Sequence, residues 1–120
     1  MRKMGININD DTLPWTEWIL NGTKSIETRN TNSLKPYIGK EVGIIRTGKK
    51  RKAMLVGYVT INEPIVYTSE EMFDKDFWKH IVAPHTTHYI KKIKYGYPLT
   101  NVRRCREKPI YSRGIISRRI

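Results

Sequence analysis

The sequence of 120 residues predicts a small α+β domain in which short strands dominate, arranged as a half-open barrel with one or two covering helices. Two observations favour this fold. Short stretches of alternating apolar and polar residues recur along the chain, and only two segments show the three- and four-residue spacing of a helix. Glycines also recur where a curved sheet needs tight bends, at Gly39, Gly43, Gly48 and Gly57. No linker composition interrupts the pattern, so we expect residues 1–120 to form a single domain.

The N-terminal part of the chain predicts a strand followed by a helix. Apolar and polar residues alternate over 4–8, which indicates a strand with one buried face. A helix follows from Pro14, which suits a first helical turn, and ends before Gly22, which suits a left-handed capping residue. We expect Asp11 and Thr12 to provide the oxygens that cap the start of this helix.

The remaining elements are mainly strands. The predicted strands cover 25–29, 42–46, 53–61, 89–95 and 99–104, and a last edge strand is expected in the tail YSRGIISRRI. A second helix is predicted between a capping box that begins at Thr68 and its end near His80. Its inward face would carry Met72, Phe73 and Phe77.

The charge of the chain is its strongest compositional feature. Lys and Arg number 23 against 11 Asp and Glu, which gives a net charge of +12. Such a protein attracts polyanions, and nucleic acid is the commonest of them. The alternative is a solvated, repelling surface. The candidate phosphate-binding residues are Lys49, Lys50, Arg51 and Lys52 in a predicted hairpin turn, and Arg103 and Arg104 on a later strand.

Other features narrow the function class. Cys105 is the only cysteine, which fits a reducing compartment and a cytoplasmic protein. No secretory signal, apolar membrane span or amphipathic surface helix is visible. The spacing of His85 and His88 resembles half of a metal site, but zinc needs three or four ligands. We therefore expect no metal and no cofactor, and no phosphate-binding glycine loop or nucleophile motif is present.

A charged segment directly follows the first helix. Lys24, Glu27 and Arg29 lie on or next to the predicted strand 25–29. Because side chains alternate along a strand, Glu27 and Arg29 share one face and can form a charge-assisted pair. This pair could simply fix the strand register, with Lys24 in solvent, although surface ion pairs contribute only ~0–1 kcal/mol.

The run PWTEWILNGTKSIETR closely resembles the signature of the ASCH domain family. That signature combines Pro-Trp, a short apolar helix and Gly-x-Lys-x-x-Glu-x-Arg, and it is matched by Pro14, Trp15, Gly22, Lys24, Glu27 and Arg29. A second block, YGYPLTNVRRCREKPIYSRG, resembles a downstream segment of the family through Tyr95, Tyr97, Asn101, Val102, Pro109, Ile110 and Gly114. The two blocks together span 14–114, in the family's order.

The resemblance implies a small PUA-like β-barrel with two or three covering helices and a cleft beside the first helix. It also implies binding of RNA or a modified nucleotide in that cleft, through Lys24, Glu27 and Arg29. The alternative is a small hydrolase acting on N4-acetylcytidine or RNA, with Lys24 and Glu27 as catalytic residues. Acetylcytidine hydrolases of the family carry threonine at the position of Glu27. A carboxylate is no obvious replacement for an activated hydroxyl, and this difference favours binding.

The aromatic residues divide into two predicted groups. Trp15 and Tyr95 lie in segments that the resemblance places beside the cleft, so we interpret them as stacking residues for a base. Trp18 and Trp78 are interpreted as residues that pack in the core or against a helix. RNA or a nucleotide is the expected partner, with DNA or a protein partner as alternatives, and the sequence indicates neither a membrane partner nor an oligomeric state.

Overall fold

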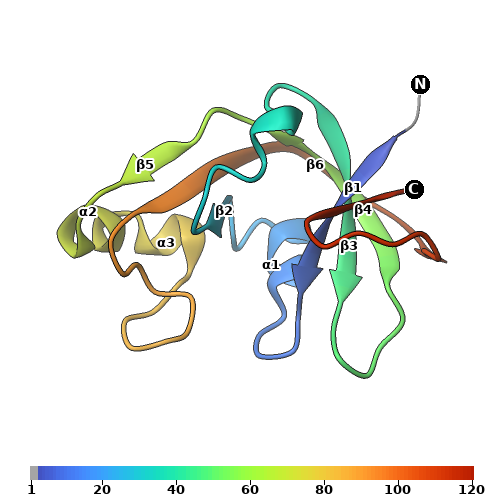
Figure 1. Ribbon diagram of the computed structural model, residues 1–120, viewed down its shortest axis with the longest axis horizontal. Coiled ribbons are helices and arrows are strands. Elements are labelled where there is room, and N and C mark those ends of the chain that lie inside the picture. Colours follow the sequence, from blue (N-terminus) through green and yellow to red (C-terminus); the bar gives the residue numbers. More distant parts are fainter. Residues whose placement is uncertain (1–2) are drawn as a thin grey trace.

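The computed structural model describes residues 3–120, which form one curled, seven-stranded mixed sheet with three short α-helices (Figure 1). The strands are β1 (Met4–Asn9), β2 (Ile26–Arg29), β3 (Glu41–Thr47), β4 (Met54–Ile61), β5 (Ile65–Tyr67), β6 (Lys94–Pro109) and β7 (Ser117–Arg119). The helices are α1 (Trp15–Leu20), α2 (Glu70–Lys75) and α3 (Phe77–His80), with a 3-10 turn η1 at Lys35–Tyr37. The small α+β half-barrel is confirmed, with three helices, as the resemblance implies, and not one or two.

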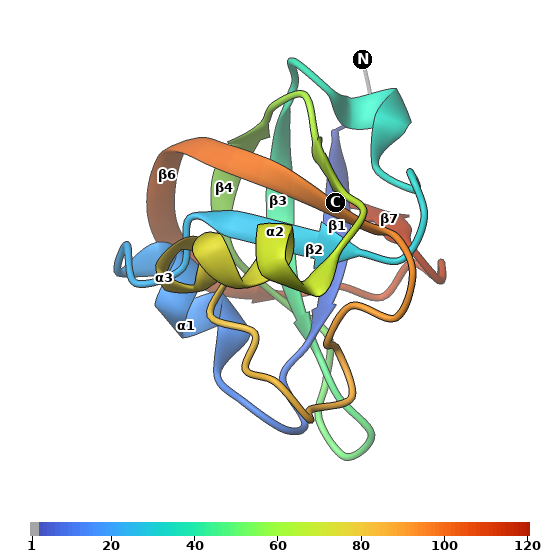
Figure 2. The ribbon, with the colours of Figure 1, turned by 90° about the vertical axis from the view of Figure 1, so that its left-hand side faces the viewer.

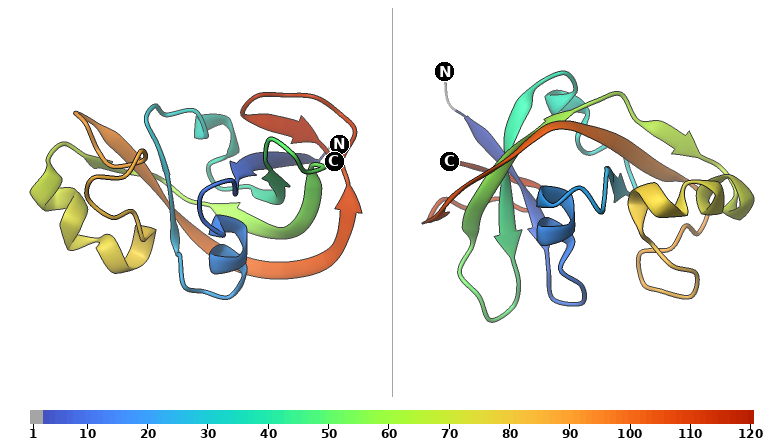
Figure 3. Two further views of the ribbon diagram at one scale, coloured as in Figure 1. Left: turned by 90° about the horizontal axis from the view of Figure 1, so that it is seen from below. Right: turned by 180° about the vertical axis from the view of Figure 1, so that it is seen from behind.

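The strand order is β2-β6-β4-β3-β1-β7, and β5 pairs with β6 as well. Only β1 and β3 are parallel; the other pairs are antiparallel. The sheet curls around itself, so β2 and β6 cross in front of β3 and β1 in Figure 2. The view from below in Figure 3 shows α1 beside β1, with α2 and α3 at the far end of β6.

The long strand β6 differs most from the sequence prediction. Two separate strands were expected over 89–95 and 99–104, whereas one 16-residue strand runs through Pro98. Pro98 is tolerated because it lies where β6 changes neighbours, from β2 and β5 on one half to β4 on the other. Two register shifts in the β4–β6 pairing, between Thr100 and Arg103 and between Arg104 and Lys108, bend the strand beyond Pro98. The segment before Lys94 is a loop rather than a strand.

Both predicted helix starts are capped one residue away from the expected position. Asp10, rather than Asp11 or Thr12, caps α1: its Oδ1 accepts the backbone N–H of Thr16 at 3.1 Å and its Oδ2 accepts the Thr16 hydroxyl. At α2 the Oγ of Ser69 accepts the N–H of Met72 at 3.1 Å. Ser69 has the extended backbone of an ordinary N-cap residue, whereas Asp10 reaches the first turn of α1 from outside the helix, since the N-cap position is Pro14.

The second predicted helix is also divided. It breaks at Asp76 into α2 and α3. Phe73 is fully buried as expected, but Met72 is exposed and Trp78 is 82% exposed, so the prediction of Trp78 as a core residue was wrong.

The main core lies between α1 and the concave face of the curled sheet. Its fully buried members include Ile6, Ile19, Ile44, Val59 and Tyr97. Gly22 follows α1 with a φ of 86°, as a left-handed capping glycine. None of the helices formed by residues 3–120 has the length and apolar character that a membrane span requires.

Candidate functional site

A cleft of about 410 Å³ opens beside α1, β1 and β2. The segment that leads into β2 is fixed on three sides by backbone hydrogen bonds. Lys24 N–H donates to the Trp18 carbonyl of α1 at 2.9 Å, and Ser25 N–H donates to the Lys79 carbonyl of α3 at 2.8 Å. The Ser25 carbonyl accepts the N–H of Leu99 from β6 at 2.8 Å. These bonds place Lys24 at the bottom of the cleft, between α1 and α3.

Lys24 is almost completely buried, with 2% exposure. Its ammonium donates to the backbone carbonyl of His80 and lies 4.6 Å from the centroid of the Trp15 ring. Both contacts stabilise a cation in a site with little water. The alternative interpretation of the sequence, which left Lys24 in solvent, does not hold because Lys24 precedes β2 and so does not follow the strand's alternation.

Glu27 and Arg29 lie side by side on β2, as the alternation of the strand predicts. The Nε and a terminal nitrogen of Arg29 both lie 3.0 Å from Oε2 of Glu27. The same guanidinium also donates to the backbone carbonyl of Asn7 on β1, at 2.9 Å. Arg29 therefore ties the carboxylate to β1, across the cleft.

Two cleft residues come from the loop and strand that follow α3. Lys94, at the start of β6, is 3% exposed and its Nζ donates to Oδ1 of Asn30 at 2.7 Å. His88 lines the cleft and meets the Trp15 ring edge-on, with centroids 6.0 Å apart. Neither was predicted as a site residue. The pairing of Arg29 with Tyr95 across β2 and β6 places the adjacent Lys94 beside Asn30, where its ammonium is also attracted by the charge of Glu27.

Burial sets the electrostatics of the cleft. It lowers the pKa of Lys24 to about 8; the charge of Glu27 opposes this shift, and Lys94 and Arg29 reinforce it. Burial also lowers the pKa of Lys94, again against the attraction of Glu27. The pKa of His88 is lowered by partial burial and by the cation of Lys94, so its imidazole is neutral at pH 7.

The cleft combines several cations with one carboxylate. Its charged residues at pH 7 are Lys24, Glu27, Arg29, Lys94 and Arg118. An anionic group such as a phosphate would be attracted by four cations in a partly dehydrated site. Glu27 adds an acceptor for an N–H group of a base. No group of three or more His, Cys, Asp or Glu side chains within residues 3–120 is arranged to hold a metal ion.

The surroundings of Trp15 and Tyr95 differ from those expected for residues that stack on a base. Trp15 lines the cleft but is only 5% exposed, and its ring is engaged by Lys24, Trp18 and His88. Because the ring is buried, Trp15→Ala is expected to cause a large loss of stability as well as a change in the cleft. Tyr95 is half-buried against the main core and does not line the cleft.

The predicted phosphate-binding residues lie outside the cleft. Lys49, Lys50, Arg51 and Lys52 lie in the turn between β3 and β4, as predicted. Arg103 lies on β6, 4.1 Å above the Tyr58 ring and 3.2 Å from Glu41. Arg104 forms a two-pronged pair with Glu17, at 2.8 and 2.9 Å. The two β6 arginines are thus already paired within the molecule.

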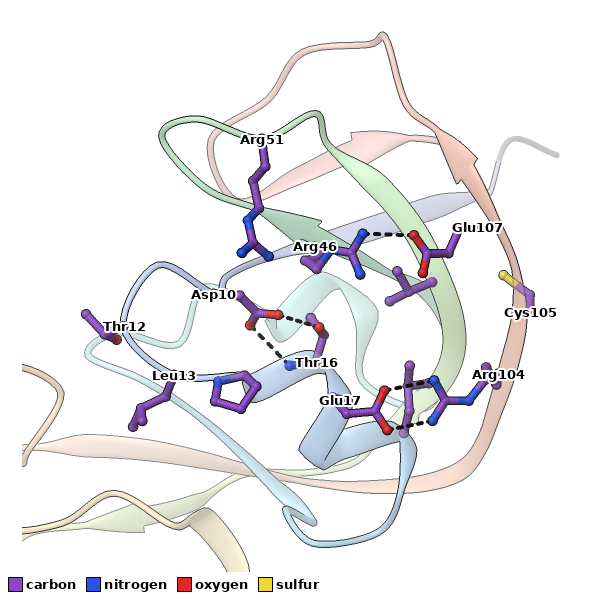
Figure 4. Close-up of a pocket in the computed structure, with 13 residues that line it drawn as sticks. Asp10, Thr12, Leu13, Thr16, Glu17, Arg46, Arg51, Arg104, Cys105 and Glu107 are labelled. Atoms are coloured by element: carbon purple, nitrogen blue, oxygen red, sulfur yellow. Dashed lines mark hydrogen bonds and ion pairs between the residues drawn. The ribbon is translucent and has the colours of Figure 1, made fainter.

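A different pocket, of about 380 Å³, follows the other face of α1 (Figure 4). We call it the α1 pocket. Its arginines face carboxylates: Arg104 meets Glu17, and Arg46 lies 2.8 Å from Glu107. Its lining holds three arginines and three acidic residues, the latter being Asp10, Glu17 and Glu107. Two of the three arginines are paired and the acidic residues equal the arginines in number, so the cleft is the stronger candidate for a site that binds an anion.

The protein is a small curled mixed sheet with a charged cleft beside its first helix. This is the fold of ASCH domains. The ASCH protein of Zymomonas mobilis matches with a TM-score of 0.71 and 12% identity, over 91% of this chain and 74% of that one. Two single-residue variants of that protein match with TM-scores of 0.71 and 0.75, at 12% and 10% identity. They cover 92% and 99% of this chain, and 77% and 88% of theirs.

No protein-family model and no curated protein matches the sequence. The comparison with known proteins therefore rests on similarity of structure, and this similarity agrees with the sequence motif from Gly22 to Arg29. At 10–12% identity, the shared property is the fold.

Proposed function

We propose that this chain is an ASCH-type domain that binds RNA or a modified nucleotide in the cleft. The observation that carries the proposal is the excess of cations there. Lys24, Arg29, Lys94 and Arg118 line the cleft with a single carboxylate, Glu27. Cations held in a site with little water attract a phosphate more strongly than exposed ones do.

The remaining carboxylate fits a nucleotide better than a simple anion. Glu27 is held in place by Arg29 at 3.0 Å and is 8% exposed. A carboxylate accepts hydrogen bonds from the exocyclic amine of a base, such as that of cytosine. A site with phosphate-binding cations and one fixed acceptor therefore matches the two ends of a nucleotide.

The test is a binding titration with two matched lysine variants. Labelled single-stranded RNA is titrated by fluorescence anisotropy at 50 and 200 mM salt, with Lys94→Gln and Lys92→Gln in parallel. Lys94 is buried in the cleft, whereas Lys92 is exposed on the preceding loop. Both variants remove one charge, so only a cleft-specific contact separates them. We expect Lys94→Gln to weaken binding at least tenfold and Lys92→Gln less than threefold; equal effects would contradict the proposal.

A second candidate function is hydrolysis in the same cleft. The observation that favours it is the pKa of Lys24, which burial lowers to about 8, so part of the population holds a neutral amine near neutral pH. Lys24 and Glu27 would then be the catalytic pair. Incubation with N4-acetylcytidine or with RNA, followed by chromatography of the products, tests this function. Turnover that Lys24→Ala abolishes supports it, and intact substrate after binding excludes it.

A further inference from the structure

A second hollow adjoins the cleft. We call it the basic groove; its volume is about 380 Å³. The turn between β3 and β4 forms one wall, with Arg51 and Lys52. The segment after β6 forms the other wall, with Tyr111 and Arg113. Neither the ASCH-type motif nor the proposed nucleotide site uses these residues.

The cleft and the basic groove share a border. Thr47 at the end of β3 and Arg118 on β7 line both hollows. Asn7 fixes the geometry at this border. Its side-chain amide donates to the carbonyls of Gly114 and Ile115, each at 2.9 Å, and its own carbonyl accepts from Arg29. The segment that carries Tyr111 and Arg113 is thus held against the same residue that anchors the cleft.

The charge of the groove is all of one sign. Arg51, Lys52, Arg113 and Arg118 line it, and no acidic residue does. Arg51 also lines the α1 pocket together with Asp10, so Lys52, Arg113 and Arg118 are the cations that the groove does not share with that pocket. None of these four side chains forms an ion pair within residues 3–120. The α1 pocket of similar size holds three acidic residues against three arginines. The groove therefore continues the positive potential of the cleft, whereas the α1 pocket does not.

An exposed aromatic ring completes the groove. Tyr111 is 80% exposed although it lines the groove. No aromatic or cation–π contact within residues 3–120 involves its ring. An exposed ring among cations is the arrangement with which proteins hold single-stranded nucleic acid, through base stacking and phosphate contacts.

We infer that the ligand is a single-stranded nucleic acid that passes from the cleft into the basic groove. One nucleotide occupies the cleft, and the neighbouring nucleotide stacks its base on Tyr111. Arg113, Arg118 and Lys52 contact the phosphates between and beyond them. This inference rests on the proposed function for the nucleotide in the cleft, and it specifies a strand rather than a free nucleotide as the ligand.

The experiment compares ligand length with two aromatic variants. The probes are a labelled eight-nucleotide RNA of mixed sequence and, as unlabelled competitors, the four ribonucleoside 5′-monophosphates. Tyr111→Ala is compared with Trp78→Ala, because Trp78 is exposed to the same degree, 82%, but lies on α3 and does not line the groove. Melting temperatures check that both variants fold. Lys94→Gln reports on the cleft in the same assay.

We expect the octamer to bind more tightly than any monophosphate. Tyr111→Ala should weaken octamer binding at least about fivefold, in keeping with the loss of one base–aromatic stack. It should leave competition by monophosphates unchanged, and Trp78→Ala should change neither. An octamer of DNA with the same sequence, bound equally well, would support recognition of bases and phosphates without the 2′-hydroxyl.

The opposing results separate the two proposals. If the octamer binds no more tightly than a monophosphate and Tyr111→Ala has no effect, the inference fails while the cleft remains a nucleotide site. If Tyr111→Ala weakens octamer binding but Lys94→Gln does not, the proposed function of the cleft fails, and with it the shared path. If none of the probes binds, both are overturned.

Discussion

At the scale of single residues, the most unusual group is the amine of Lys24. It is buried with 2% exposure, near one carboxylate and the two further cations of Lys94 and Arg29. Its charge is tolerated because the His80 carbonyl and the face of Trp15 interact with it. Folding nevertheless favours the neutral amine, since burial lowers the pKa from 10.5 to about 8.

This lowered pKa predicts a specific dependence of stability on pH. Between about pH 8 and pH 9.5 the unfolded chain keeps the Lys24 proton and the folded chain releases it, so folding becomes more favourable as the pH rises. The free energy of unfolding of the wild type should therefore rise relative to that of Lys24→Met, by up to ~2 kcal/mol over this range. Urea titrations of both proteins at several pH values measure the difference. A constant difference would show that Lys24 titrates as an exposed lysine does.

The charged cluster was only partly predictable at this scale. Glu27 and Arg29 are two residues apart on one strand, so their pairing follows from local geometry. Lys94 reaches Asn30 across a separation of 64 residues, and no local pattern marks it among its neighbouring lysines. The position of Lys94 in the cleft depends on the register between β2 and β6, which the tertiary structure sets. In the sequence, only its place next to the aromatic residues of the second motif block pointed to Lys94.

At the scale of elements, the helix starts show how local chemistry selects between neighbours. Thr68 and Ser69 are both capable caps by residue type, but the side chain of Ser69 makes the hydrogen bond to Met72 N–H. Ser69→Ala should therefore lower the free energy of unfolding by ~1 kcal/mol. Thr68→Ala serves as the control and should change it by less than ~0.5 kcal/mol. Thermal or urea unfolding distinguishes the two, and a larger effect at Thr68 would restore the capping box that the sequence suggested.

The bend between β4 and β6 depends on a glycine. A Cβ on Gly57 would lie 2.6 Å from the backbone carbonyl oxygen of Arg103, which cannot move without disturbing the sheet. Gly57→Ala should destabilise the protein by ~1–3 kcal/mol. Gly48→Ala is the matched control, because a Cβ there would meet only the side chains of Asp11 and Arg51. Equal melting temperatures for the two variants would contradict the close approach of β6 at Gly57.

The strands were predictable where an apolar, β-branched run was long enough to recognise. β1, β3 and β4 were expected close to their observed bounds, because each is such a run between turn residues, although β3 is buried at four successive positions and not on one face alone. β5 has three residues, too few for a pattern. β6 was divided at Pro98 because proline usually interrupts a strand, and its position between two sets of neighbouring strands is a property of the whole sheet.

At the scale of the whole molecule, the position of a charge matters more than the total of +12. Removing Lys52 and Arg113 takes two unpaired cations from the basic groove, whereas removing Arg103 and Arg104 takes two that are paired with Glu41 and Glu17. Both double variants to glutamine change the net charge equally. The groove variant should reduce the slope of log affinity for RNA against log salt by about 2, and the β6 variant by less than about 1. Equal slopes would mean that only net charge steers binding.

The second half of β6 has one further consequence. Beyond Leu99, β4 covers one side of the strand, and no other strand within residues 3–120 pairs with the opposite side. An open edge of this length is a template on which a second copy of the chain could add its own strand and begin to aggregate. The exposed charges of Arg103, Arg104, Arg106, Glu107 and Lys108 line this stretch. Charged side chains on an edge strand disfavour edge-to-edge pairing between molecules. These arginines can therefore protect the molecule from aggregation whether or not they contact a ligand.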